Sequence, residues 1–228
     1  MTVVAIDGPS GSGKSTISRQ VAERLGMAYL DTGAMYRAAA WWCLRDGIDL
    51  ADRDAVARAV RELPLEMATD PRDPGVAVGG EDVSAVIRST EISTLVSAVA
   101  TNLEVRAELR RRQREIIDAA RGGRGIVAEG RDITTVVAPD ADVRILLVAS
   151  EDARLARRAR EIHGAADDSA LAATRDQVLR RDADDATVSS FHVAADGVVT
   201  VDSSDLTLEE TVDAVRALVE SAAQGSDR

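Results

Sequence analysis

The chain has 228 residues, of which 45% are hydrophobic and 29% charged, and its formal net charge is −11. This length and balance predict a folded protein with a sizeable core, built as one α/β unit with insertions. The negative charge argues against nucleic acid or an anionic membrane as a partner, and no apolar run approaches the roughly 20 residues of a membrane span. The single cysteine, Cys43, excludes an internal disulfide and is interpreted as a buried apolar residue, so a cytoplasmic location is expected.

Apolar runs and amphipathic stretches alternate along the chain. Strands are expected over residues 2–6, 28–30, 126–128, 143–148 and 198–201, and helices over residues 14–25, 34–45, 52–63, 90–120 with a break near 101–102, 151–162, 169–183 and 207–222. This order predicts a parallel sheet with helices on both faces. Between residues 64 and 83, prolines and glycines separate the short runs 65–67 and 76–78, which predicts a small antiparallel sheet inserted into the larger unit.

The segment from Gly8 to Thr16 fits the pattern G-x-x-x-x-G-K-[ST] without a mismatch. It lies between a predicted strand and a predicted helix, where backbone N–H groups form an anion-binding nest beside the positive end of the helix dipole. Lys14 would reach the β- and γ-phosphates of a nucleoside triphosphate, and Ser15 would bind Mg²⁺. A bare glycine turn with a chance lysine is the alternative. The expected ATP-binding residues are Gly8, Pro9, Ser10, Gly11, Ser12, Gly13, Lys14, Ser15 and Thr16.

A second polar segment, from Asp31 to Arg37, follows the strand over residues 28–30, so it is expected at the carboxyl edge of the sheet, where ligands bind. The Thr32 hydroxyl at a helix start and the Arg37 guanidinium one turn later would form a second phosphate site facing the first. Alternatively, Thr32 only caps the helix and Arg37 is a solvated charge. No Asn-Lys-x-Asp segment occurs, which disfavours a GTPase.

The segment Glu129-Gly-Arg-Asp132 ends the strand over residues 126–128 and places charges at the same edge of the sheet. Arg131 is expected to bind phosphate, and a carboxylate beside it could accept a hydrogen bond from an exocyclic amine. Cytosine presents such an amine next to two ring acceptors, so a carboxylate with an arginine or hydroxyl donor would fit it. Uracil would leave the same protein groups unpaired.

Arginines are concentrated in the two predicted helices over residues 151–162 and 169–183. They are Arg154, Arg157, Arg158, Arg160, Arg175, Arg180 and Arg181. Spacings of three and four residues place Arg154, Arg157 and Arg158 on one helix face. We interpret the pair of helices as a mobile lid that brings guanidinium groups over a transferring phosphate. The alternative is a solvated basic face balanced by neighbouring carboxylates.

Several of these segments occur in the order seen in bacterial cytidylate kinases: residues 8–16, 31–37, 80–84 with 87–88, 96–99, 105–106, 129–132 with 139–141, and 180–182. From residue 2 to about residue 216 the chain therefore resembles this family of P-loop nucleoside monophosphate kinases. The resemblance implies an α/β fold with a P-loop NTPase-like parallel sheet flanked by helices, a small inserted antiparallel sheet of three strands and a helical lid. It implies a single domain, with a core over 1–32, 104–150 and 189–223, a monophosphate-binding region with the insert over 33–103, and a lid over about 151–188.

The resemblance implies that the γ-phosphoryl group of ATP is transferred to CMP or dCMP, in pyrimidine nucleotide metabolism, by a monomer that takes Mg²⁺ with its ATP. The residues expected to carry catalysis are Lys14, Arg131, Arg157, Arg158 and Arg181. The implied CMP-binding residues are Thr32, Tyr36, Arg37, Ser97, Arg106, Arg131, Asp132, Arg181 and Asp185. Of these, Ser97, Arg106 and Asp132 would contact cytosine, whereas Arg181 and Asp185 would contact sugar and phosphate.

Two other functions stay open at this point: a kinase for UMP or AMP, and a P-loop module that binds nucleotide without transferring phosphate. The second anion site favours a kinase, because a pure switch protein needs none. The lid also departs from the family pattern, since Val188 stands where an arginine is usual. Either Arg158 or Arg180 replaces the missing charge, or turnover is lower.

Overall fold

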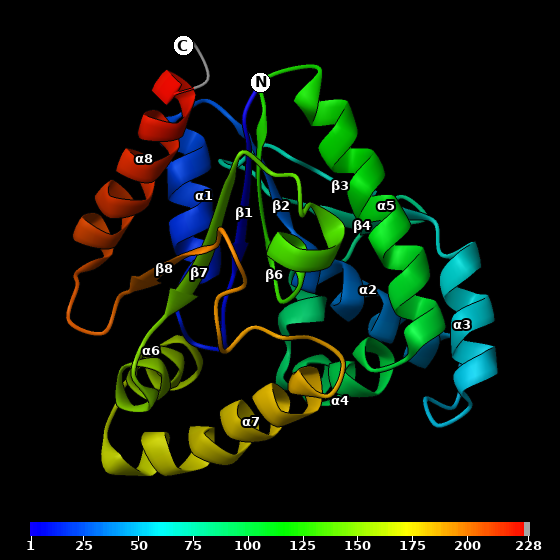
Figure 1. Ribbon diagram of the computed structural model, residues 1–228. Coiled ribbons are helices and arrows are strands. Elements are labelled where there is room, and N and C mark those ends of the chain that lie inside the picture. The colour runs from blue at the N-terminus through cyan, green and yellow to red at the C-terminus, as the bar shows by residue number, and fades with distance from the viewer. Residues whose placement is uncertain (226–228) are drawn as a thin grey trace.

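The structure is a computed structural model that describes residues 1–225, and its main feature is a five-stranded parallel sheet in the order β2-β6-β1-β7-β8 (Figure 1). The strands are β1 (Val3–Asp7), β2 (Ala28–Asp31), β6 (Ile126–Gly130), β7 (Val143–Val148) and β8 (Val199–Asp202). A second sheet of three antiparallel strands contains β3 (Leu65–Met67), β4 (Val76–Val78) and β5 (Glu81–Asp82). The predicted fold class and the inserted sheet are therefore confirmed.

Helices surround the parallel sheet. They are α1 (Lys14–Arg24), α2 (Thr32–Arg45), α3 (Arg53–Glu62), α4 (Thr90–Ala100), α5 (Leu103–Arg121), α6 (Glu151–His163), α7 (Asp168–Ala186) and α8 (Leu208–Gly225), with a 3₁₀ turn η1 (Val86–Arg88) and a π-helical turn η2 (Ile133–Val137). Among residues 1–225, no helix is long and apolar enough to cross a membrane. The predicted tail over residues 224–228 is still helical at residues 224 and 225, and residues 226–228 lie outside the described part of the chain.

Two apolar cores lie on opposite faces of the sheet because successive side chains of a strand point to opposite sides. Val3 and Ala5 of β1 belong to the core that α2, α3, α4 and α5 cover. Val4 and Ile6 belong to the core beneath α1 and α8. Figure 1 shows α1 and α8 on one side of the sheet and α2, α3 and α5 on the other. The strand β1 therefore lies between the two cores, and the phosphate-loop sequence follows its carboxyl end.

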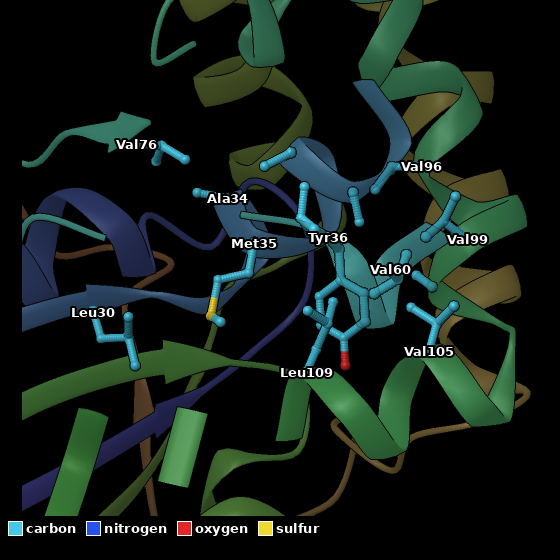
Figure 2. Close-up of a cluster of buried hydrophobic side chains, with 14 of the residues drawn as sticks. Leu30, Ala34, Met35, Tyr36, Val60, Val76, Val96, Val99, Val105 and Leu109 are labelled. Carbon is cyan, nitrogen blue, oxygen red and sulfur yellow. The ribbon is translucent and has the colours of Figure 1, made fainter. Parts of the chain in front are cut away.

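The larger core anchors α2 beside the carboxyl edge of the sheet. Figure 2 shows Met35 and Tyr36 of this helix among Leu30, Val105 and Leu109. The helix begins two residues earlier than predicted, because the carboxylate of Asp31, rather than Thr32, caps it by accepting from the N–H of Ala34 at 2.9 Å. Capping by Asp31 leaves the Thr32 hydroxyl for another partner. On the same helix, Cys43 is buried as predicted, and burial raises the pKa of its thiol to about 11.

Two glycines are required where the chain passes close to the phosphate loop and to α2. Gly13 precedes α1 with φ of 88°, a left-handed conformation that other residues adopt only with strain. Gly130 ends β6 so close to α2 that a Cβ atom there would lie 2.5 Å from Oγ1 of Thr32. The absence of that side chain lets the two loops meet at one edge of the sheet.

Candidate active site

A cavity of about 590 Å³ opens at the carboxyl edge of the sheet. Its walls are the loop before α1, the start of α2, the end of β6 and the helix α7. The predicted residues that line it include Ser10, Gly11, Gly13, Lys14, Ser15 and Thr16 of the phosphate loop. Those from other elements are Thr32, Tyr36, Arg37, Arg106, Arg131, Asp132, Arg158, Arg181 and Asp185. Five predicted site residues do not line the cavity: Gly8, Pro9, Ser12, Ser97 and Arg157.

Lys14 is the only lysine of the chain, and it lies at the start of α1 inside the loop. Its Nζ donates to the carbonyl oxygen of Pro9 at 3.3 Å. Removal from water lowers the pKa of Lys14 to about 8, and the positive charges of Arg131 and Arg181 act in the same direction. The ammonium therefore sits in an electropositive, partly dehydrated site that an anionic ligand would neutralise.

This lowered pKa predicts a pH-dependent affinity for ATP. As the pH rises through about 8, Lys14 of the ligand-free protein loses its proton, so ATP binding and kcat/KM for ATP are expected to fall between pH 8 and 9.5. The Lys14→Arg variant keeps its charge in this range and should not show the same decline. Because there is one lysine, NMR of lysine-labelled protein measures the titration directly. A midpoint near the ordinary value of 10.5 would contradict this prediction.

Two carboxylates lie side by side where β2 and β6 end, since Asp31 is the register partner of Glu129. Oε1 of Glu129 accepts from the Ser15 hydroxyl at 2.5 Å and from the Tyr29 hydroxyl at 3.2 Å. Burial raises the pKa of Glu129, and the charge of Asp31 adds to the effect, whereas Lys14 opposes it. Glu129 is thus a buried carboxylate next to the phosphate loop, and the sequence did not single it out as a site residue.

Asp31 holds the cations of the second predicted phosphate site. Its Oδ2 atom accepts from Nη2 of Arg37 at 2.8 Å and from Nη2 of Arg88 at 3.4 Å. Although burial acts in the opposite direction, these two guanidinium groups hold the pKa of Asp31 below its usual value. Thr32 donates through Oγ1 to the carbonyl oxygen of Glu129 at 2.7 Å. Arg37 is 9% exposed, so the alternative of a solvated charge is wrong.

Arg88 is a site residue that the sequence interpretation missed. It lies in η1, after the inserted sheet, and it lines the cavity opposite the phosphate loop. The family resemblance included the pair Ile87-Arg88 but indicated no role for it. The ion pair with Asp31, 57 positions away, is what brings Arg88 to the phosphate site.

Arg131 connects the end of β6 to the lid helix α7. Its Nε atom donates to Oδ2 of Asp185 at 3.0 Å, and its Nη2 atom donates to Oδ1 of Asp182 at 3.1 Å. The guanidinium also donates to the carbonyl of Gly8 and lies 4.5 Å from the ring centre of Phe191. Arg131 therefore faces the cavity while carboxylates from the lid occupy its donors.

Asp182 attaches α7, the second helix of the predicted lid, to the phosphate loop. Its Oδ1 accepts from the backbone N–H of Ser10 at 2.9 Å, and its Oδ2 accepts from Arg154. Arg154 also donates to the carbonyl oxygen of Ser10 at 2.9 Å. Both helices of the predicted lid thus bind the backbone of Ser10. Arg154 of α6 donates to its carbonyl oxygen, and Asp182 of α7 accepts from its N–H group.

The lid arginines take different positions. Arg157 was predicted to face the transferring phosphate, but its Nη1 donates to the carbonyl of Ser12 at 3.2 Å and to Oγ of Ser203 at 2.9 Å, so it braces the outer side of the loop. Arg158 lines the cavity and pairs with Glu161 at 2.8 Å. Arg181 also lines the cavity, and burial together with Arg131 lowers the pKa of its guanidinium to about 10.

The far end of the cavity carries the predicted base-reading residues. Nη2 of Arg106 donates to Oδ2 of Asp132 at 2.7 Å and to Oγ of Ser189 at 2.6 Å. Behind Asp132, the carboxylate of Asp7 accepts from the backbone N–H groups of Ile133 and Thr134, at 2.9 and 2.8 Å, which fixes the π-helical turn η2. No local pattern predicted this turn, because its stabilising partner is 126 positions away.

Ser97, the third predicted base contact, is not brought to the cavity. It is partly buried on α4 between Val96 and Ala100, both of which line the cavity. The helix α4, on which Ser97 was predicted to contact the base, thus does form part of the cavity wall. Its lining residues are the apolar Val96 and Ala100 rather than Ser97.

Residues 4–221 match a family model described as cytidylate kinase. A cytidylate kinase from Cutibacterium acnes is 51% identical over 219 residues, which cover 95% of each chain. The chain belongs to the cytidylate kinase family. A cytidylate kinase from Streptomyces griseus is 48% identical to this family member, over 96% of this chain and 92% of its own length. Another, from Corynebacterium diphtheriae, is 46% identical, over 99% of this chain and 97% of its own length. Among solved structures, a gluconokinase from Sinorhizobium meliloti is similar over 98% of this chain and 94% of its own, at 16% identity and a TM-score of 0.47.

Proposed function

We propose that this chain transfers the γ-phosphoryl group of ATP to CMP or dCMP, giving ADP and CDP or dCDP. The observation that carries the proposal is one cavity lined both by the phosphate loop and by a second cluster of cations, which includes Arg37 and Arg88. A protein that only binds one nucleotide needs the first site but not the second. Cytidylate kinases that cover nearly the whole chain support the same reaction.

The cations of the cavity fit phosphoryl transfer, in which positioning and charge neutralisation supply most of the catalysis. Lys14 would contact the donor phosphates, and Arg37 and Arg88 the acceptor phosphate. Arg131 and Arg181 come from different elements and line the cavity together, so they would contact the phosphoryl group in transfer. The four arginines each lie within 4 Å of an aspartate. Arg37 and Arg88 pair with Asp31, Arg131 pairs with Asp182, and Arg181 pairs with Asp185. Incoming phosphates would replace these carboxylates as partners.

Mg²⁺ would enter with ATP as part of the substrate. The Ser15 hydroxyl and the Glu129 carboxylate are in hydrogen-bond contact beside the loop, and oxygen atoms are the ligands that Mg²⁺ prefers. Their position fits an ion bound to the β- and γ-phosphates. The ion would neutralise charge on these phosphates, while Ser15 and Glu129 orient it. We further propose a cytoplasmic monomer with no nucleic-acid or membrane partner, which is consistent with the net charge of −11.

The base preference follows from Asp132 and Arg106. A carboxylate accepts from the exocyclic amine of cytosine, and a guanidinium donates to its ring acceptors. Uracil presents a carbonyl oxygen to the carboxylate, so the buried acceptor would be left unpaired. We therefore expect kcat/KM for UMP to be about tenfold to more than a hundredfold below that for CMP.

An assay that couples ADP release to a spectroscopic readout tests this function, with CMP, dCMP, UMP and AMP offered in turn. CMP or dCMP should be the best acceptor, and Asp132→Asn should narrow the difference between CMP and UMP. Equal kcat/KM for UMP and CMP would show that another group selects the base. Release of ADP that no monophosphate accelerates would instead favour a nucleotide-binding module.

A further inference from the structure

The base-reading end of the cavity contains an arginine that no sequence motif indicates. Arg110 donates from Nε and Nη2 to Oδ2 of Asp132, at 2.9 and 2.6 Å. Arg106 donates to the same oxygen at 2.7 Å. Since Asp132 is 4% exposed, two guanidinium groups hold one oxygen of a buried carboxylate through short, charge-assisted hydrogen bonds.

The two arginines that contact Asp132 differ in their exposure to the cavity. They are four residues apart on α5 and therefore neighbours on one helix face. Each follows a core residue, Val105 or Leu109, whose side chain is buried in the cluster of Figure 2 and fixes the helix in place. Arg106 lines the cavity but Arg110 does not, so Arg110 contacts Asp132 from outside the ligand space.

This arrangement leaves one acceptor and one donor without protein partners. Oδ1 of Asp132 accepts no hydrogen bond from any of residues 1–225, because all three donors converge on Oδ2. Nε of Arg106 is buried and also lacks a partner within the described chain. A ring amine in the cavity would satisfy Oδ1, whereas the enclosed Nε of Arg106 is out of its reach.

We propose that Arg110 is a positioning residue for base selection. By holding Oδ2 from behind, it keeps Oδ1 of Asp132 available as the acceptor for the amine of an aminopyrimidine monophosphate. It also shares Oδ2 with Arg106, so that the carboxylate does not depend on Arg106 alone for its position. This inference rests on the proposed function, in which Asp132 contacts the base.

Four variants of the full chain test the proposal. Arg110→Leu removes the guanidinium group but keeps apolar bulk, and Arg110→Lys keeps the charge with a single donor group. Arg114→Leu is the matched control, because Arg114 lies one turn further along α5 and holds the same turn η2 through the carbonyls of Val136 and Val137 without contacting Asp132. Asp132→Asn tests the proposed base contact itself.

The measurements are kcat and KM for CMP, UMP and ATP, calorimetric binding of CMP, and the melting temperature of each variant. Arg110→Leu is expected to raise KM and Kd for CMP by roughly threefold to thirtyfold, in the range of couplings within one hydrogen-bond network. The ratio of kcat/KM for CMP to that for UMP should fall by a similar factor, with KM for ATP unchanged. Arg110→Lys should restore part of the ratio, and Arg114→Leu should leave it at the wild-type value.

Two results would overturn the inference alone: an unchanged ratio in Arg110→Leu while Asp132→Asn loses discrimination, or an equal loss in Arg110→Leu and Arg114→Leu. The second result would mean that Arg110 only attaches α5 to the turn. If Asp132→Asn keeps full discrimination, the proposed base contact fails, and the role of Arg110 fails with it. Comparison of these variants therefore separates the two failures.

Discussion

Replacing Lys14 by alanine is expected to lower kcat by about 10²–10³-fold, the usual effect of removing one preorganised group that stabilises charge in a transition state. Lys14 is the cation that the phosphate loop presents to the cavity. Because Lys14 would contact the donor nucleotide and not the acceptor, binding of CMP should stay close to normal. The measurement is steady-state kinetics together with calorimetric titration of CMP.

Thermal melting of Lys14→Ala supplies the control for this result. Removing a buried ammonium should not lower the melting temperature, because the charge is costly to bury, as its lowered pKa indicates. A variant that loses activity only because it unfolds would contradict the assignment, as would a variant that is folded and fully active.

Replacing Arg181 by alanine is expected to have the second large effect, a fall in kcat of about 10³–10⁵-fold by analogy with arginine fingers. Arg181 lines the cavity from the lid helix α7. Its contact with the transferring phosphate would be complete only when the lid is closed, so kcat should fall more than KM rises. Arg180→Ala is the matched control, because Arg180 directly precedes Arg181 but is exposed and does not line the cavity.

Val188 extends this test, since it is partly buried just beyond the end of α7 where an arginine is usual. If the missing charge is a true loss, Val188→Arg should raise kcat or lower KM for CMP. If Arg158 replaces it, Val188→Arg should change nothing and Arg158→Ala should be severely impaired. Arg158 is the better placed of the two candidates, because it lines the cavity and Arg180 does not. Full turnover in all these variants would mean that the lid arginines form only a solvated face.

The elements predicted best were those whose stability is encoded locally. The strand Val143–Val148 was predicted with its observed bounds because five of its six residues are apolar and lie in one short run. The phosphate loop was equally clear, since its glycines and its lysine lie in one short segment between a strand and a helix. In both cases a few neighbouring residues determine the backbone.

The residues that prediction missed depend on contacts between distant parts of the chain. Arg110 looks like an ordinary surface arginine in the sequence, and Arg88 lies in a family segment without an indicated role. Only the fold brings them to Asp132 and Asp31. Arg157 illustrates the opposite error. It was expected at the transferring phosphate beside Arg158, but its guanidinium donates to the backbone carbonyls of Ser12 and Ser203 and does not line the cavity.

The position of Lys14 makes the donor site chemically addressable. With no other lysine in the chain, the only competing primary amine is the N-terminus. Because the pKa of Lys14 is about 8, a useful fraction of the side chain is a neutral nucleophile under mildly alkaline conditions, where ordinary lysines stay protonated. A single acylation there would remove the charge that the phosphates require. Occupancy of the site by ATP would shield the same nitrogen, so amine labelling of this protein reads out nucleotide binding at one atom.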